Sequence, residues 1–138
     1  PAVASVLPHT DFFLPSIEEA RAVSGLSHMR DAAKYFLDLG VCACVFTLGG
    51  EGAYYHDRDG RTFAMPAFDV AVKCSCGCGD AFNAGFAVGL VNGFDVEATV
   101  RFAQATSALN ATGLGSQAGV ESFERTLDFA KTTRTRVS

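Results

Sequence analysis

The stretch KCSCGCGDAFNAGF, residues 73–86, decides how the chain folds and poses the first question about its function. It begins as a loop rich in cysteine and glycine, contains one acidic residue, Asp80, and continues as a helical pattern to Val91. Small and large apolar residues form two stripes on that helix, which predicts close packing on a sheet. The loop itself has two competing interpretations: a cysteine metal site, or a loop that holds an anion beside an acid.

The metal interpretation rests on the spacing of the cysteines. Cys74, Cys76 and Cys78 follow a C-x-C pattern, whereas structural zinc sites usually use C-x2–4-C with a second chelating pair. Cys42 and Cys44 lie in an apolar run, where cysteine commonly acts as a small hydrophobe. A cysteine metal or redox protein therefore stays only as an alternative.

The anion interpretation rests on the start of the helix. Gly77 and Gly79 allow the backbone to approach a ligand closely. The first N–H groups of a helix have no intrahelical partners, and the helix dipole adds positive potential, so a phosphate suits this position. Asp80 would repel a phosphate, but it fits a base that takes a proton from a hydroxyl beside that phosphate. A plain helix cap explains Asp80 equally well at this stage.

The rest of the chain alternates between strand and helix patterns, which predicts an α/β fold. Ser16 and Glu19 have capping-box spacing, and the apolar run 41–48 is typical of a strand buried on both faces in a parallel sheet. Asp59-Gly60 predicts a β-hairpin. The remaining elements expected are strands at 11–14 and 67–72 and helices at 16–23, 27–39, 96–111 and 121–131.

Composition bounds the class of protein. The chain has 138 residues, of which 49% are hydrophobic and 19% charged, so it fits one globular domain. A net charge of −4 without a Lys/Arg-rich run argues against a nucleic-acid partner. No apolar run is long enough for a membrane span, so a cytoplasmic protein is expected. A P-loop motif is absent, and the glycine-rich segment 113–119 follows a helix, unlike a Rossmann dinucleotide motif.

Several motifs together resemble one family. GCGDAFNAGFAVGL (77–90) is similar to the Gly-Ala-Gly-Asp signature of the ribokinase-like (PfkB) carbohydrate kinases, with Cys78 at the Ala position. TLGGEG (47–52) resembles their nucleotide-phosphate loop, and PSIEEA (15–20) resembles their Asn-x-x-Glu region. RFAQATSALNATGLGSQAG (101–119) resembles their last helix and the adjoining loop.

The resemblance implies a fold and an activity. Residues 1–138 would be a single domain, the C-terminal, nucleotide-binding part of a longer sugar kinase without its substrate and lid portion. That part has a Rossmann-type three-layer α/β/α fold with a β-hairpin. The implied reaction is phosphorylation of a small sugar's hydroxyl by ATP with Mg²⁺, in which the isolated fragment has little or no activity. A homodimer stays open, and so does the alternative of a non-catalytic nucleotide-binding module or inactive kinase fragment.

The resemblance also assigns roles to residues. Asp80 would be the catalytic base, and the N–H groups of Gly77, Cys78 and Gly79 would form the anion hole. Residues expected at ATP are Thr47, Gly49, Gly52 and Gln104; Glu19 would organise magnesium, and Asn110, Gly113, Gly115 and Gly119 would hold a monovalent cation.

Two positions depart from the family's pattern. Cys74 stands where the family usually has an Asp that binds the monovalent cation, so a K⁺ site would lack that ligand. Ser16 replaces the Asn of Asn-x-x-Glu, so Ser16 and Glu19 also fit a simple capping box.

Overall fold

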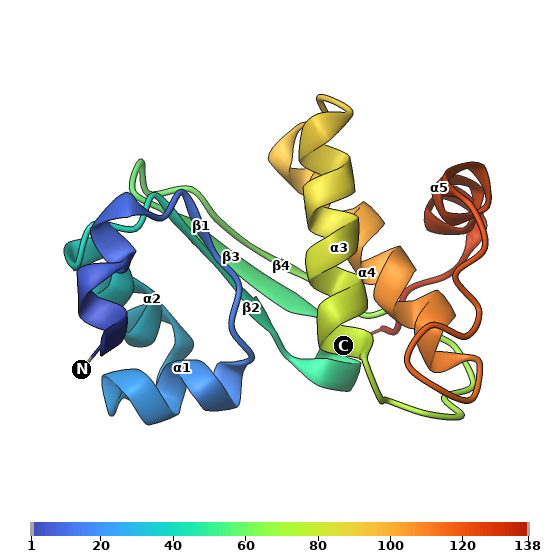
Figure 1. Cartoon of the computed structure of the whole chain (residues 1–138), viewed down its shortest axis with the longest axis horizontal. Helices are drawn as coiled ribbons and strands as arrows, with labels where there is room; N and C mark the ends of the chain where they lie inside the picture. Colours follow the sequence, from blue (N-terminus) through green and yellow to red (C-terminus); the bar gives the residue numbers. More distant parts are fainter. Residues whose placement is uncertain (1, 138) are drawn as a thin grey trace. The chain divides into compact units, whose positions relative to one another are not determined.

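The computed structural model describes residues 2–137 (Figure 1). The chain divides into two compact units, the first ending at Ala64 and the second beginning at Met65. No helix within residues 2–137 combines the length and apolarity needed to cross a bilayer.

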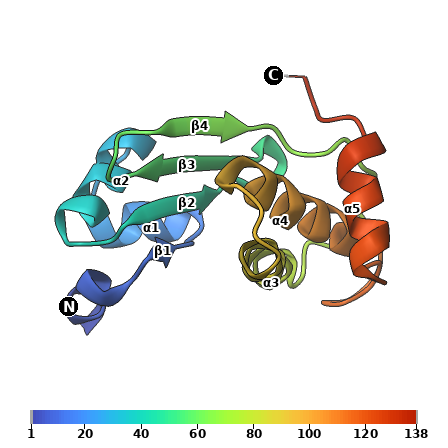
Figure 2. The same cartoon turned by 90° about the horizontal axis from the view of Figure 1, so that it is seen from above.

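The first unit contains a four-stranded sheet in the order β1-β2-β3-β4 (Figure 2). β2 pairs parallel with β1 and antiparallel with β3, so the expected parallel sheet is in fact mixed. The tight connections from β2 to β3 and from β3 to β4 impose this change of direction. The elements of this sheet unit are η1 Ala2–Ser5, η2 Leu7–His9, β1 Phe12–Phe13, α1 Ile17–Ser24, α2 Met29–Asp38, β2 Ala43–Thr47, η3 Gly49–Glu51, β3 Ala53–Asp57 and β4 Thr62–Met65.

The core of the sheet unit lies between β2 and the helices α1 and α2. Cys44 and Phe46 of β2 are fully buried against Ala20 and Phe36 of the two helices. The ring of Phe36 lies 4.8 Å from that of Phe13 on β1. The predicted burial of this strand is therefore confirmed, and both helices begin and end within two residues of their predicted bounds.

The predicted hairpin is confirmed between β3 and β4. Gly60 has a φ of 86°, a conformation that glycine adopts without a Cβ penalty. The Asp57 carboxylate accepts hydrogen bonds from the N–H groups of Asp59, at 3.0 Å, and Arg61, at 2.9 Å. These bonds hold the turn and fix the register of the two strands.

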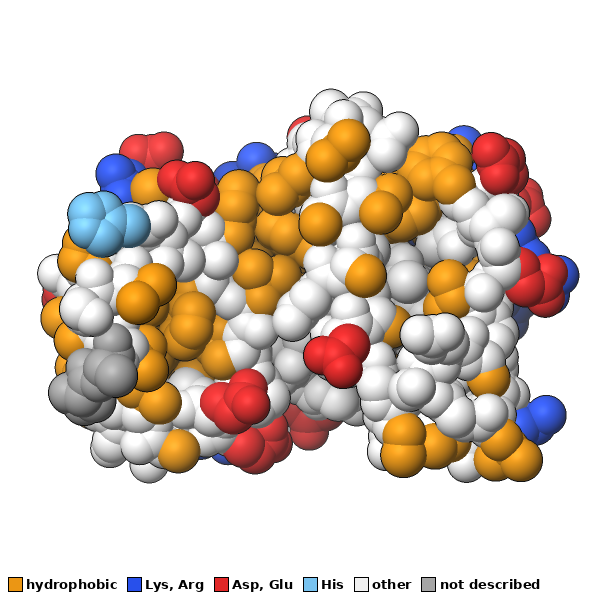
Figure 3. All heavy atoms as spheres, viewed as in Figure 1, with side chains coloured by type: hydrophobic (Ala, Val, Ile, Leu, Met, Phe, Trp, Pro, Cys, Tyr) orange, Lys and Arg blue, Asp and Glu red, His pale blue; other side chains and the backbone are white. Residues whose placement is uncertain are grey.

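The second unit consists of helices α3 (Cys78–Val91), α4 (Val96–Ala111) and α5 (Phe123–Thr132). A Cβ on Gly85 would lie 2.9 Å from the Cα of Ala103, and one on Gly89 would lie 3.1 Å from the Cα of Thr99. The predicted close packing of α3 is confirmed. Its partner within this unit is helix α4, whereas the sequence predicted packing on a sheet. Several hydrophobic side chains of α3 are exposed at the surface, and Figure 3 shows hydrophobic atoms over this helix.

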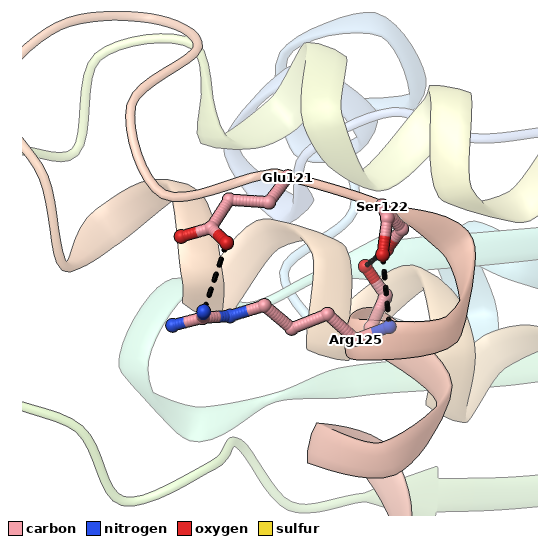
Figure 4. Close-up of polar contacts among 4 residues, drawn as sticks. Glu121, Ser122 and Arg125 are labelled. Carbon is pink, nitrogen blue, oxygen red and sulfur yellow. Dashed lines mark hydrogen bonds and ion pairs between the residues drawn. The ribbon is translucent and has the colours of Figure 1, made fainter.

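The segment at the start of the helical unit corrects one prediction. Segment 67–72 forms no strand and contributes one isolated bridge, between Phe68 and Thr135. The C-terminal segment follows α5, whose first turn is capped by Ser122: its Oγ accepts from the N–H of Arg125 at 3.1 Å (Figure 4). An ion pair of 2.8 Å between Arg125 and Glu121 spans the same turn (Figure 4).

Candidate functional sites in the two units

Asp80 lies in the first turn of α3 and not at its cap. Gly77 is the N-cap, with a φ of 73°, and it supplies no side-chain hydrogen bond to the helix. Asp80 is exposed, and among residues 2–137 its carboxylate has no hydrogen-bond or ion-pair partner. The capping explanation of Asp80 therefore finds no support, and the carboxylate is available for chemistry.

The backbone N–H groups around Asp80 divide into engaged and available donors. The N–H of Cys78 donates to the carbonyl of Ser75 at 3.2 Å and closes a turn. Within the described chain, the N–H groups of Gly77, Gly79 and Asp80 donate to no protein acceptor. Two of the three amides expected in an anion hole, those of Gly77 and Gly79, are thus open at a helix start, where they can bind an anion.

The loop before α3 packs against the 113–119 loop. A Cβ on Gly77 would lie 2.8 Å from the Cβ and the carbonyl oxygen of Ser116, so the two loops are in close contact. Gly115 and Gly119 have φ values of 109° and 94°, and a Cβ on Gly113 would collide with Ala118. The structure therefore explains these glycines, expected at a cation, by backbone conformation and close packing.

Asn110 fastens α4 to the loop before α3. It is fully buried, and its Nδ2 donates to the carbonyl of Cys76 at 2.9 Å and to the Sγ of Cys78 at 3.5 Å. Its Oδ1 has no partner among the described residues. This oxygen could face a cation, but Cys74 offers sulfur where a hard cation prefers oxygen. The residues present therefore fit a K⁺ site poorly.

Two thiols in this loop influence each other. The pKa of the Cys74 thiol is lowered, first by the N–H of Cys76, then by the Cys76 thiol and by the N–H of Gly115. The pKa of the Cys76 thiol is raised, chiefly by its hydrogen bond to Cys74. Among the described residues, no three His, Cys, Asp or Glu side chains are close enough to hold a metal ion.

Gln104, the residue expected near the adenine, is held within the helical unit by its side-chain amide. It is buried, and its Nε2 donates to the carbonyls of Met65, at 2.8 Å, and Pro66, at 3.3 Å. The side-chain amide thus anchors the segment that enters the helical unit. Its place near the adenine stays a prediction beside this structural role.

The sheet unit brings two of the predicted motifs together. Thr47, at the end of β2, forms a parallel bridge with Ser16, and its N–H donates to Pro15 at 3.1 Å. Gly49 and Gly52, with φ values of 57° and 114°, then turn the chain through η3. The phosphate-loop candidate and the start of α1 are therefore neighbours.

Glu19 takes part in the capping box that its spacing predicted. Its Oε2 accepts from the N–H of Ser16 at 2.8 Å, and the Ser16 Oγ accepts from the N–H of Glu19 at 3.2 Å. The side chain is exposed, so a second carboxylate oxygen stays open to a ligand. One or two carboxylates suit Mg²⁺ that is carried by substrate phosphates, so the side chain fits this ion.

The contacts of Asn110 and Ser116 were missed by sequence reasoning. The Asn110–Cys76 hydrogen bond joins residues 34 positions apart, and no local pattern marks such a pair. The Ser116 contact depends on how two loops pack. The only sequence signal was the abundance of glycine in both loops.

Comparison with known proteins shows the family of the chain. The pfkB family carbohydrate kinase profile matches residues 1–122. The chain is 35% identical over 120 residues to the deoxyribokinase of Salmonella typhi, an alignment that covers 83% of the chain and 39% of the relative. The match thus spans less than half the length of that relative.

Solved structures show the same fold. The ribokinase of Thermotoga maritima superposes with a TM-score of 0.88 at 29% identity, over 94% of this chain and 45% of that protein. A putative ribokinase II from E. coli, in complex with ATP and Mg²⁺, superposes with a TM-score of 0.86 at 28% identity, over 94% of this chain and 42% of that protein. The α/β fold predicted from the sequence is confirmed, and the chain belongs to the pfkB family of carbohydrate kinases.

Proposed function

We propose that this chain carries the ATP site and the catalytic base for phosphoryl transfer to a hydroxyl of a small sugar. The observation that carries the proposal is Asp80: an exposed carboxylate without a partner among residues 2–137, in the first turn of a helix where the amides of Gly77 and Gly79 are open. Family membership supports the reaction class. The sugar itself stays unassigned.

The chemistry follows from these groups. Asp80 accepts the proton of the sugar hydroxyl as the hydroxyl oxygen attacks the terminal phosphorus of ATP and the bond to the leaving ADP breaks. The N–H groups of Gly77 and Gly79 stabilise the charge on the phosphoryl group in transfer. These donors are fixed by the fold before the substrate arrives, so they need no reorganisation during the reaction.

The nucleotide phosphates fit the β2–η3 loop in this proposal. Gly49 and Gly52 give that loop its backbone conformation, and Thr47 precedes it at the end of β2. Glu19, through its open carboxylate oxygen, would hold a water of Mg²⁺. The ion would neutralise phosphate charge when bound.

A second candidate keeps ATP binding without turnover. It is favoured by Cys74, which replaces the family's usual carboxylate. Such a module would bind nucleotide, but would show no sugar-dependent release of ADP.

The test is ADP release from ATP and Mg²⁺ by the longest native polypeptide that contains this segment. A panel of pentoses, hexoses, deoxysugars and nucleosides serves as acceptors, with Asp80→Asn in parallel. Sugar-dependent ADP release that is lost in Asp80→Asn supports the kinase and names its substrate. ATP binding without release for any acceptor supports the binding module, and unchanged release by Asp80→Asn would refute the role of Asp80.

A further inference from the structure

The proposed phosphoryl transfer gives no role to the two cysteines in the loop before α3, Cys74 and Cys76. Cys74 and Cys76 are two positions apart at the surface, and the N–H of Cys76 donates to the Sγ of Cys74 at 3.4 Å. That hydrogen bond folds the short segment back on itself and keeps Cys76 beside the Cys74 sulfur. We propose that Cys74 and Cys76 form a reversible disulfide, and that its formation weakens anion binding at the start of α3.

The other three cysteines are placed differently. Cys78 is half-buried, with its Sγ directed at the carbonyl of Ser107 at 3.6 Å. Cys44 is buried in β2. Cys42 lies in the sheet unit, with its Sγ 2.8 Å from the Arg58 guanidinium. Within the described residues, only Cys74 and Cys76 combine surface access with a second thiol beside them.

The oxidation needs a partner, which we name as a low-molecular-weight disulfide such as glutathione disulfide. The Cys74 thiolate attacks one sulfur of glutathione disulfide, whose S–S bond breaks and releases a glutathione thiolate. The Cys76 thiolate then attacks the sulfur of Cys74 in the mixed disulfide and releases the second glutathione. Two electrons pass from the pair to glutathione disulfide, and the two thiol protons end on the two released glutathione molecules.

The consequence for the anion site follows from the backbone between the two thiols. The carbonyl of Cys76 accepts from Asn110, and the next residue is Gly77, the αL cap whose amide is open. A disulfide across two positions closes a small ring and restricts the peptide between them. The hydrogen bond of the Cys76 N–H to the Cys74 thiol must then change, and the orientation of the Gly77 amide changes with it. An exposed and strained disulfide is also readily reduced, as a reversible switch requires.

The effect of the disulfide on anion binding rests on the proposed nucleotide site. The experiment therefore measures disulfide formation and ATP affinity separately. The full chain is equilibrated in glutathione buffers from fully reduced to fully oxidised. Peptide mass spectrometry then scores the disulfide, and titration calorimetry measures ATP affinity with Mg²⁺. The variant Cys76→Ser lacks the second thiol, and Cys42→Ser is the matched control in the sheet unit.

The expected result is an internal Cys74–Cys76 disulfide in wild type and Cys42→Ser, with ATP affinity at least about tenfold weaker than in the reduced chain, a change worth about 1.4 kcal/mol. Cys76→Ser should stop at a glutathione adduct on Cys74. Absence of the internal disulfide at every ratio overturns the inference. Equal ATP affinity of the reduced and oxidised chains overturns the link to the anion site. If the reduced chain binds no ATP at all, the proposed nucleotide site fails, and the link fails with it while the dithiol stands.

Discussion

Glu19 and Asp80 occupy the same position in two helices, the third residue of the first turn, but their carboxylates have opposite surroundings. At the start of α1, Ser16 and Glu19 exchange two hydrogen bonds in a capping box. At the start of α3, the cap is Gly77, and Asp80 has no partner among the described residues. An acid without a hydrogen-bond or ion-pair partner, beside open amides, is the better candidate for chemistry, because no side-chain contact accounts for it.

The largest expected difference between the two acids is in catalysis. Under the proposed function, Asp80→Asn should lower the turnover of the longest native polypeptide by ~10²–10⁴-fold, the usual contribution of a general base. The free energy of unfolding should change by no more than about 0.5 kcal/mol, because no contact is lost. Steady-state rates and urea unfolding of the same preparation give both values. A large loss of stability with the rate intact would contradict the contrast with Glu19.

The glycine cap of α3 offers the next test. Gly77→Ala places a side chain at positive φ and against Ser116, so it should destabilise the chain by about 2–4 kcal/mol. Gly93, with a φ of 72° and no neighbour within 4 Å of a Cβ, is the matched control. Gly93→Ala should cost about 1 kcal/mol, from the backbone alone. Equal losses in urea unfolding would show that the contact with the 113–119 loop contributes nothing.

The boundaries of helices and the hairpin could be predicted from the sequence, because their signals are local. Ser16 with Glu19, Asp95 and Asp59-Gly60 mark a capping box, an N-cap and a turn within a few residues. The capping box also shows the limit of such signals, since the same spacing fits both a structural and a magnesium-binding Glu19. The hydrogen bond between Glu19 and Ser16 shows that Glu19 has a structural role, which the spacing alone could not show.

Other features depend on contacts between distant segments and could not be predicted. The amide of Gln104 holds the carbonyls of Met65 and Pro66, 39 and 38 positions away, and no local pattern marks those partners. Segment 67–72 is apolar enough for a strand, but it forms only one bridge, to Thr135 near the C-terminus. Hydrophobic periodicity indicates which face of a segment is buried. It does not indicate which distant segment will pair with it or accept its hydrogen bonds.

The buried thiol of Cys44 should make the stability of the chain depend on pH. Burial raises the pKa of the Cys44 thiol from its ordinary value of 9.0 to about 12. Between these values the unfolded chain loses the proton and the folded chain keeps it, so stability falls as pH rises. The loss from this one group should reach about 1.4 kcal/mol at pH 10. Urea unfolding at pH 8 and pH 10 should show a smaller pH-dependent loss in Cys44→Ala, and identical losses in the two proteins would contradict the assignment.

The smallest expected effect separates the two roles of Glu19. Glu19→Ala removes the carboxylate from the capping box and should destabilise the chain by about 1 kcal/mol. Glu19→Gln keeps an acceptor for the Ser16 N–H, so it should retain most of that stability while it loses the charge. If Glu19 also organises magnesium, as proposed, Glu19→Gln should need more Mg²⁺ for ATP binding, although its unfolding curve stays near that of wild type. A Mg²⁺ dependence equal to that of wild type would assign Glu19 to the fold alone, and Asp80 would then be the only one of the two acids used in the reaction.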